Sequence, residues 1–149
     1  MKVFKVFRVL SDGELVSTYH GSLPEGWSMS YRAGLQSRPD KGKVFAFDNE
    51  WTAKEFAKKH CLRLSFGDMV VYECEAEDVA SQELVAFSWT RRGFARFWSR
   101  SRQDLDASSA PAGSVGCTSI IPKRQVSYFS KSTYTDILAG GDLIGINKG

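Results

Sequence analysis

Histidine, cysteine and long apolar runs are all scarce in this sequence. It contains two histidines, His20 and His60, and three widely spaced cysteines, Cys61, Cys74 and Cys117, with no Cys-x-x-Cys pair. A structural zinc site needs closely spaced thiolate or imidazole ligands, and a disulfide framework needs paired cysteines, so we expect neither a metal site nor disulfides. Reduced thiols in an intracellular protein fit this pattern.

Sequence motifs that build active sites are also missing. The chain has no Gly-x-Ser-x-Gly nucleophile elbow, no P-loop and no Gly-x-Gly-x-x-Gly fingerprint. Each of these motifs creates a catalytic or phosphate-binding geometry through its local backbone, so their absence leaves no complete catalytic set and points to no resident cofactor. The sequence favours a non-enzymatic role, with the question of an enzyme left open.

No stretch is apolar for long enough to serve as a targeting or membrane segment. The first ten residues, MKVFKVFRVL, mix charged with apolar residues and lack the continuous apolar core of a signal peptide. No other segment approaches the length needed to cross a bilayer. We therefore expect a soluble, cytoplasmic protein with no membrane partner.

The overall composition is that of one ordinary globular domain spanning residues 1–149. Of the 149 residues, 42% are hydrophobic and 25% are charged, which suffices to bury a core without disulfides. Twenty basic residues against 17 acidic ones give a net charge of +3, an excess too small to identify a polyanionic partner by itself. The distribution of the charges must decide that question.

The most informative stretch is GKVFAFDNEWTAKEFAKKH, residues 42–60. Its apolar run at 44–47 predicts a buried strand, and Asp48 or Asn49 can cap a helix whose first turn carries Glu50. Apolar residues and one histidine then recur at three- and four-residue spacing: Ala53, Phe56, Ala57 and His60. This pattern predicts a strand that runs directly into a helix packed on a sheet.

The remaining segments predict mostly antiparallel strands. Residues 3–10 and 14–19 form a hairpin around Asp12-Gly13, and a short strand lies near residues 29–33 within a long loop. A strand at 69–74 is followed by a partner at 84–89, and strands at 115–121 and 125–129 are joined across Pro122. Residues 104–113, rich in Ala, Ser, Pro and Gly, are expected to be a mobile loop. The predicted fold class is a single α+β domain with an N-terminal hairpin and one or two packed helices.

The strongest anomaly of composition is the arginine segment, residues 89–102, WTRRGFARFWSRSR. It has no acidic residue, and its proposed partner-binding residues are Arg91, Arg92, Arg96, Arg100, Arg102 and Trp98. If the segment is helical from Arg92, three aromatic residues share one face beside a row of arginines. Arginine binds phosphate or carboxylate in a bidentate way, so the segment suits nucleic acid or an acidic protein surface. The alternative is that the aromatics are core and the arginines an ordinary solvated face.

The tripeptide His20-Gly21-Ser22 follows a predicted strand, and Phe45 lies on a later strand that precedes an alanine-bearing helix. This layout resembles that of ADP-ribosyltransferase domains of the histidine, tyrosine, glutamate class. The resemblance implies that these residues bind the nicotinamide half of NAD, with His20 and Ser22 as site residues. The late strand of this chain carries no glutamate, and Gln125 is the nearest residue able to bond a ribose. Transfer is therefore expected to be absent or very slow.

The chain also loosely resembles small uncharacterised phage and bacterial proteins with a charged N-terminal hairpin before a strand-helix unit. Three functions stay open. The first is a small intracellular binding protein, non-enzymatic and possibly phage-encoded, that uses its arginine and aromatic surface to engage an anionic partner. The second is an ADP-ribosyltransferase-like NAD-binding domain, active or degenerate, and the third is a phage structural or assembly component in the host cytoplasm. No oligomeric state is implied.

Overall fold

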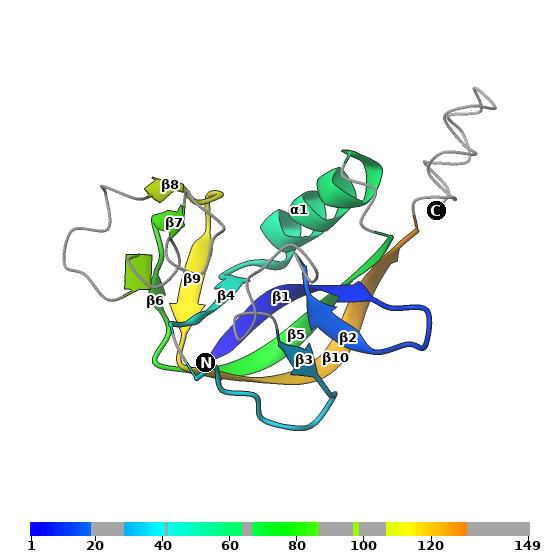
Figure 1. Cartoon of the computed structure of the whole chain (residues 1–149), viewed down its shortest axis with the longest axis horizontal. Helices are drawn as coiled ribbons and strands as arrows, with labels where there is room; N and C mark the ends of the chain where they lie inside the picture. Colours follow the sequence, from blue (N-terminus) through cyan, green and yellow to red (C-terminus); the bar gives the residue numbers. More distant parts are fainter. Residues whose placement is uncertain (19–28, 41, 64–66, 87–96, 99–106, 131–149) are drawn as a thin grey trace.

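The computed structural model describes residues 1–18, 29–40, 42–63, 67–86, 97–98 and 107–130. These residues form a mostly antiparallel sheet with one α-helix, α1, packed against it (Figure 1). The predicted α+β class is confirmed.

Strand β1 (Lys2–Val9) lies at the centre of the sheet. Strand β5 (Asp68–Glu77) pairs with it along one side, from Lys2↔Glu75 to Val9↔Asp68. On the other side β1 pairs with β4 (Val44–Phe47) and with β2 (Leu15–Ser17). The predicted hairpin is therefore β1–β2, and Gly13 in its turn has a φ of 88°, a value that glycine adopts without steric cost.

A long, bent ribbon supplies the rest of the sheet. Strand β5 runs past Asp78, whose φ is 50°, into β6 (Ala80–Ser81), while β9 (Ser114–Cys117) runs past Thr118 into β10 (Ser119–Phe129). Strand β10 pairs with β5, and β9 pairs with both β6 and β4. Because β9 continues along the chain into β10, these pairings form a closed circuit from β1 through β4, the β9–β10 segment and β5 back to β1.

Pro122 lies inside β10 and does not end a strand, contrary to the two separate strands expected from the sequence. The residue is buried and sits opposite Cys74, and the register shifts between Pro122 and Arg124. A strand tolerates proline where the ladder is irregular, because the missing N–H then breaks no regular hydrogen bond.

Residues 30–38 cross from one side of the sheet to the other. Strand β3 (Ser30–Tyr31) pairs with β2, and six residues later Ser37 forms a bridge with Ile120 of β10. The amide of Ser37 donates to the Ile120 carbonyl at 2.8 Å, and the Ile120 amide donates to the Ser37 carbonyl at 2.9 Å. This crossing segment covers the inner face of the sheet, which holds the larger apolar cluster, including Val3, Phe7 and Tyr31.

Helix α1 (Glu50–Arg63) covers the opposite face. It begins after Asn49, whose side-chain oxygen accepts from the Thr52 amide at 2.8 Å, so the predicted cap is Asn49. The side chains facing the sheet are small and fully buried: Ala53, Ala57 and Cys61. Their size lets the helix lie close to the apolar residues of β1 and β5, among them Val6 and Val71.

The structure differs from the sequence prediction for the strand expected at 84–89 and for the loop expected at 104–113. Both edges of β5 are occupied by β1 and β10, so the strand expected at 84–89 does not pair with it. Instead β7 (Leu84–Ala86) pairs with β8 (Ala107–Ser109), which lies within the segment expected to be a loop. A short strand rich in Ala and Ser carries no period-two apolar signal, which explains why it was missed.

Candidate functional site

Two aromatic residues of the arginine segment are described, and both pack against the body of the protein. Phe97 is completely buried, and its ring contacts the Trp98 ring edge-on at 4.9 Å. The Trp98 ring lies 5.6 Å from the ring of Phe45 in β4. A Cβ on Gly42 would come within 2.6 Å of the indole, so glycine is required there for this contact. These contacts therefore place Phe97 and Trp98 beside β4.

The arginines themselves lie outside the described residues. Arg91, Arg92, Arg96, Arg100 and Arg102 are therefore not placed, and whether the segment is helical before Phe97 stays a prediction. Arg96 directly precedes Phe97 in the chain, and Arg100 follows Trp98 by two residues.

The residues assigned to NAD by resemblance are only partly described. His20, Gly21 and Ser22 lie outside the described residues. Phe45 and Gln125 are described, and the structure does not bring them together. Two strands, β1 and β5, separate their strands in the sheet order, which amounts to roughly 14 Å at the usual strand spacing of about 4.8 Å.

Phe45 and Gln125 also face opposite sides of the sheet. Phe45 alternates with Val44 and Ala46 of the inner cluster, so its side chain is on the α1 side. Gln125 is opposite Tyr72, which packs against the inner cluster. The NAD-binding reading stays a prediction that depends on the first motif.

A groove of about 500 Å³ runs along the outer side of α1. It is bounded on one side by the helix and on the other by Pro111, which precedes β9. Its floor includes the Phe56 ring, which contacts Phe47 of β4 at 5.2 Å and stacks on the His60 ring at 3.9 Å. No local sequence pattern predicts this groove, because it forms where Pro111, before β9, meets the helix.

The His60 ring lines the groove and adds little positive charge to it. Its Nδ1 lies 2.9 Å from the Phe56 carbonyl, a geometry in which the ring nitrogen donates. Burial lowers the pKa of His60 below its ordinary value, with the Lys59 ammonium acting in the same direction. The ring is therefore mainly neutral near pH 7, and the positive charge of the groove comes from Lys58 and Lys59.

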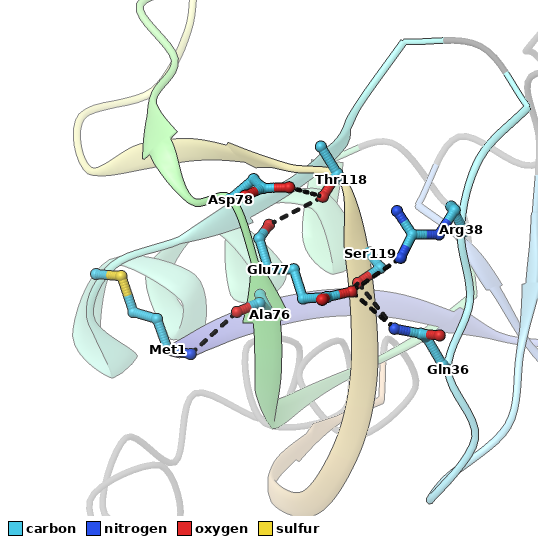
Figure 2. Close-up of polar contacts among 8 residues, drawn as sticks. All are labelled: Met1, Gln36, Arg38, Ala76, Glu77, Asp78, Thr118 and Ser119. Carbon is cyan, nitrogen blue, oxygen red and sulfur yellow. Dashed lines mark hydrogen bonds and ion pairs between the residues drawn. The ribbon is translucent and has the colours of Figure 1, made fainter.

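A second polar cluster surrounds Glu77 at the bend between β5 and β6 (Figure 2). One oxygen of Glu77, Oε1, accepts from Gln36 at 2.8 Å, from Arg38 at 2.9 Å and from the hydroxyl of Ser119. Gln36 also donates to the Ser119 oxygen at 3.1 Å. Ser119 and then Arg38 hold the pKa of Glu77 below its ordinary value.

This arrangement connects the crossing segment to β5 and β10. The lowered pKa makes the Glu77 carboxylate a weaker proton acceptor than an ordinary glutamate, and its Oε1 already accepts three hydrogen bonds. Its three donors come from residues 36–38 and from the start of β10, the two segments joined by the Ser37 bridge. Because the three contributing segments are far apart in sequence, no local motif could reveal the cluster.

Lys5 is the one charged residue in the buried part of the inner face among the described residues. It is 7% exposed, and its Nζ donates to the Phe45 carbonyl at 2.7 Å. The Nζ atom also lies 5.6 Å from the centre of the Phe7 ring and 5.5 Å from that of Tyr31. Burial lowers the pKa of Lys5 to about 8.

All three cysteines are buried and reduced. Burial raises the pKa of Cys74 to about 12 and raises that of Cys117 as well, so neither thiol is a reactive thiolate near neutral pH. Within the described ranges no group of His, Cys, Asp and Glu side chains is arranged to hold a metal ion. In the same part of the chain no helix is both long and apolar enough to cross a bilayer.

The chain and its fold were compared with family models, with curated proteins and with solved structures. None of the three comparisons gives a match.

Proposed function

We propose that the protein is a small, non-enzymatic binding protein that engages an anionic macromolecule through its arginine segment. The observation that carries the proposal is the packing of Trp98 against Gly42 and Phe45, with the buried Phe97 ring against Trp98. Anchoring two residues of a cationic segment reduces the conformational freedom that the segment must lose when a partner binds.

The charge pattern supports an anionic partner. Five arginines occur within residues 89–102 without one acid, and Arg96 and Arg100 flank the anchored pair. Guanidinium groups pair with phosphate or carboxylate in a bidentate geometry, which lysine cannot reproduce.

The test compares two triple variants that remove the same charge. Arg92, Arg96 and Arg100 are replaced together by Gln, and the control replaces Arg32, Lys123 and Arg124, all exposed and distant from β4 along the sheet order. Binding is measured by anisotropy with labelled single-stranded DNA, double-stranded DNA, RNA and polyglutamate. We expect the first variant to lose binding to one of these probes while the control retains it, and thermal melting of both variants checks that no loss of binding comes from unfolding.

The salt dependence identifies the partner class. If the probe is duplex DNA, removing three phosphate contacts should reduce the slope of log K against log salt by about 2 to 3. Equal affinities of the two triple variants for every probe, or no binding of any probe by the wild type, would refute the proposal.

A further inference from the structure

The outer side of α1 carries a second surface that combines apolar groups with positive charge. Trp51, in the first turn, is 72% exposed, although a tryptophan normally buries most of its ring. The lining of the groove between α1 and Pro111 begins at the next residue, Thr52, and includes Lys58 and Lys59. Exposed tryptophans and arginine- or lysine-rimmed apolar grooves are typical of protein contact sites.

Within the part of the chain that the structure describes, the ammonium groups of Lys58 and Lys59 form no ion pair. Lys54, on the same helix, pairs with Glu50, but neither Lys58 nor Lys59 has a carboxylate within 4.0 Å among the described residues. Glu55, one turn before Lys59, is likewise unpaired in this part of the structure. The two lysines also stand in the last two turns of the helix, where the backbone dipole adds negative potential and holds the cations in place.

The lining of the groove indicates what would enter it. Phe56, Pro111 and the methyl group of Thr52 present an apolar surface, and the volume of about 500 Å³ is enough for one or two large side chains. A phosphodiester backbone has no apolar group to place there. Glu55 would also repel a nucleic acid, because every nucleotide carries a negatively charged phosphate. A peptide, in contrast, can have carboxylates opposite Lys58 and Lys59 and uncharged residues opposite Glu55.

We propose that this face of α1 docks an acidic peptide segment of a partner protein, with an aromatic or aliphatic side chain in the groove and carboxylates on Lys58 and Lys59. Trp51 extends the apolar contact toward the N-terminal end of the helix. This surface is separate from the arginine segment and does not depend on the proposed function, because it is formed only by residues 51–60 and Pro111.

The experiment uses three short fluorescein-labelled peptides and a single-stranded oligonucleotide. The first peptide mixes Asp and Glu with Phe and Leu, the second replaces Phe and Leu with Ser, and the third replaces the acids with Lys. We expect the first to bind most tightly and to shift the amide resonances of α1 and Pro111's neighbours in isotope-labelled protein. Equal binding of the first two peptides, or tighter binding of the oligonucleotide at α1, would overturn the proposal.

Three variants test the contacts. Lys58→Glu combined with Lys59→Glu should weaken the first peptide by about tenfold or more, because like charges then meet across the contact. Arg32→Glu combined with Lys123→Glu makes the same change of charge elsewhere and should leave the affinity within about twofold. Glu55→Gln should strengthen binding, because it removes the one repulsive charge.

The outcomes separate this inference from the role of the arginine segment. Loss of binding in the arginine variant alone would place the peptide on that segment and refute docking on α1. A wild-type affinity in the Lys58 and Lys59 variant would do the same. Thermal melting of each variant shows whether a loss of affinity comes from unfolding. If the variant with Lys58→Glu and Lys59→Glu melts at a lower temperature than the wild type, the milder double change Lys58→Gln and Lys59→Gln takes its place.

Discussion

Replacing Lys5 with methionine should stabilise the protein near neutral pH, although it removes a hydrogen bond. Lys5 is buried among Phe7, Tyr31 and the Phe45 carbonyl, with no carboxylate beside it among the described residues. Burial lowers its pKa from 10.5 to about 8. At about 1.4 kcal/mol per pH unit, the cost of holding the charged form inside the fold is about 3 kcal/mol.

Methionine has a similar length and no charge, so it removes this cost. It also leaves the Phe45 carbonyl without its lysine donor, a loss of about 1 kcal/mol, so the net gain at pH 7 should be about 2 kcal/mol. This advantage of the variant shrinks as the pH rises. Because the unfolded lysine stays protonated up to about pH 10 while the folded lysine loses its proton near pH 8, the stability of the wild type relative to the variant rises across that window.

Urea unfolding of both proteins from pH 6.5 to 9.5 measures the effect. The phenol of Tyr31, whose pKa is raised, affects both proteins alike, whereas the Lys5 ammonium itself lowers the pKa of Cys74 and of Cys117. The difference between the two curves therefore reports Lys5 together with its coupling to these two thiols. We expect the advantage of the variant to shrink as the pH rises above 8. Parallel curves, or a variant less stable than the wild type at pH 7, would show that the ammonium is well compensated in the fold.

Three further changes test the packing of the fold. Phe56→Ala should lower the free energy of unfolding by about 2 to 3 kcal/mol, because its ring is only partly buried against Phe47, and an unchanged melting temperature would contradict the contact. Gly42→Ala should displace Trp98 and change tryptophan fluorescence, whereas Gly34→Ala, with a similar positive φ but open space around it, should cost only backbone strain. Ser119→Ala should lower stability by about 1 to 2 kcal/mol and speed hydrogen exchange at the Ser37 and Ile120 amides, and unchanged exchange there would show that the Glu77 cluster does not fix the crossing segment.

The parts of the fold that follow from local chemistry were predicted. Asp12-Gly13 predicted the first hairpin because a tight turn needs a positive φ, and Asn49 predicted the start of α1 because its side chain replaces a missing backbone acceptor. The predicted strand-helix unit is present, and the rings of Phe47 and Phe56 are in contact across it. The ring of Phe45 packs on Trp98, a residue far away in the sequence, so no local pattern could predict that contact.

The parts that depend on distant pairings were not predicted. The bridge between Ser37 and Ile120 and the choice of β10 as the partner of β5 are set by contacts across most of the chain, which no local pattern encodes. Lys5 is at a position of β1 whose side chain faces the inner cluster. The alternation of polar and apolar residues cannot show whether a lysine at such a position is buried or whether the strand is shifted by one residue. The α1 groove was missed for a similar reason, since periodicity finds the buried face of a helix and says little about its outer side.

The closed circuit of strands has a consequence for synthesis on the ribosome. Strand β5 needs β1 on one side and β10 on the other, and β10 begins only at Ser119. While residues 78–118 are being made, the apolar edge of β5 has no partner strand and is open to pairing with other chains. Productive folding must therefore wait until β10 has emerged, so nascent chains arrested before Ser119 should be held by chaperones and aggregate when those are withdrawn, whereas chains released after Phe129 should not.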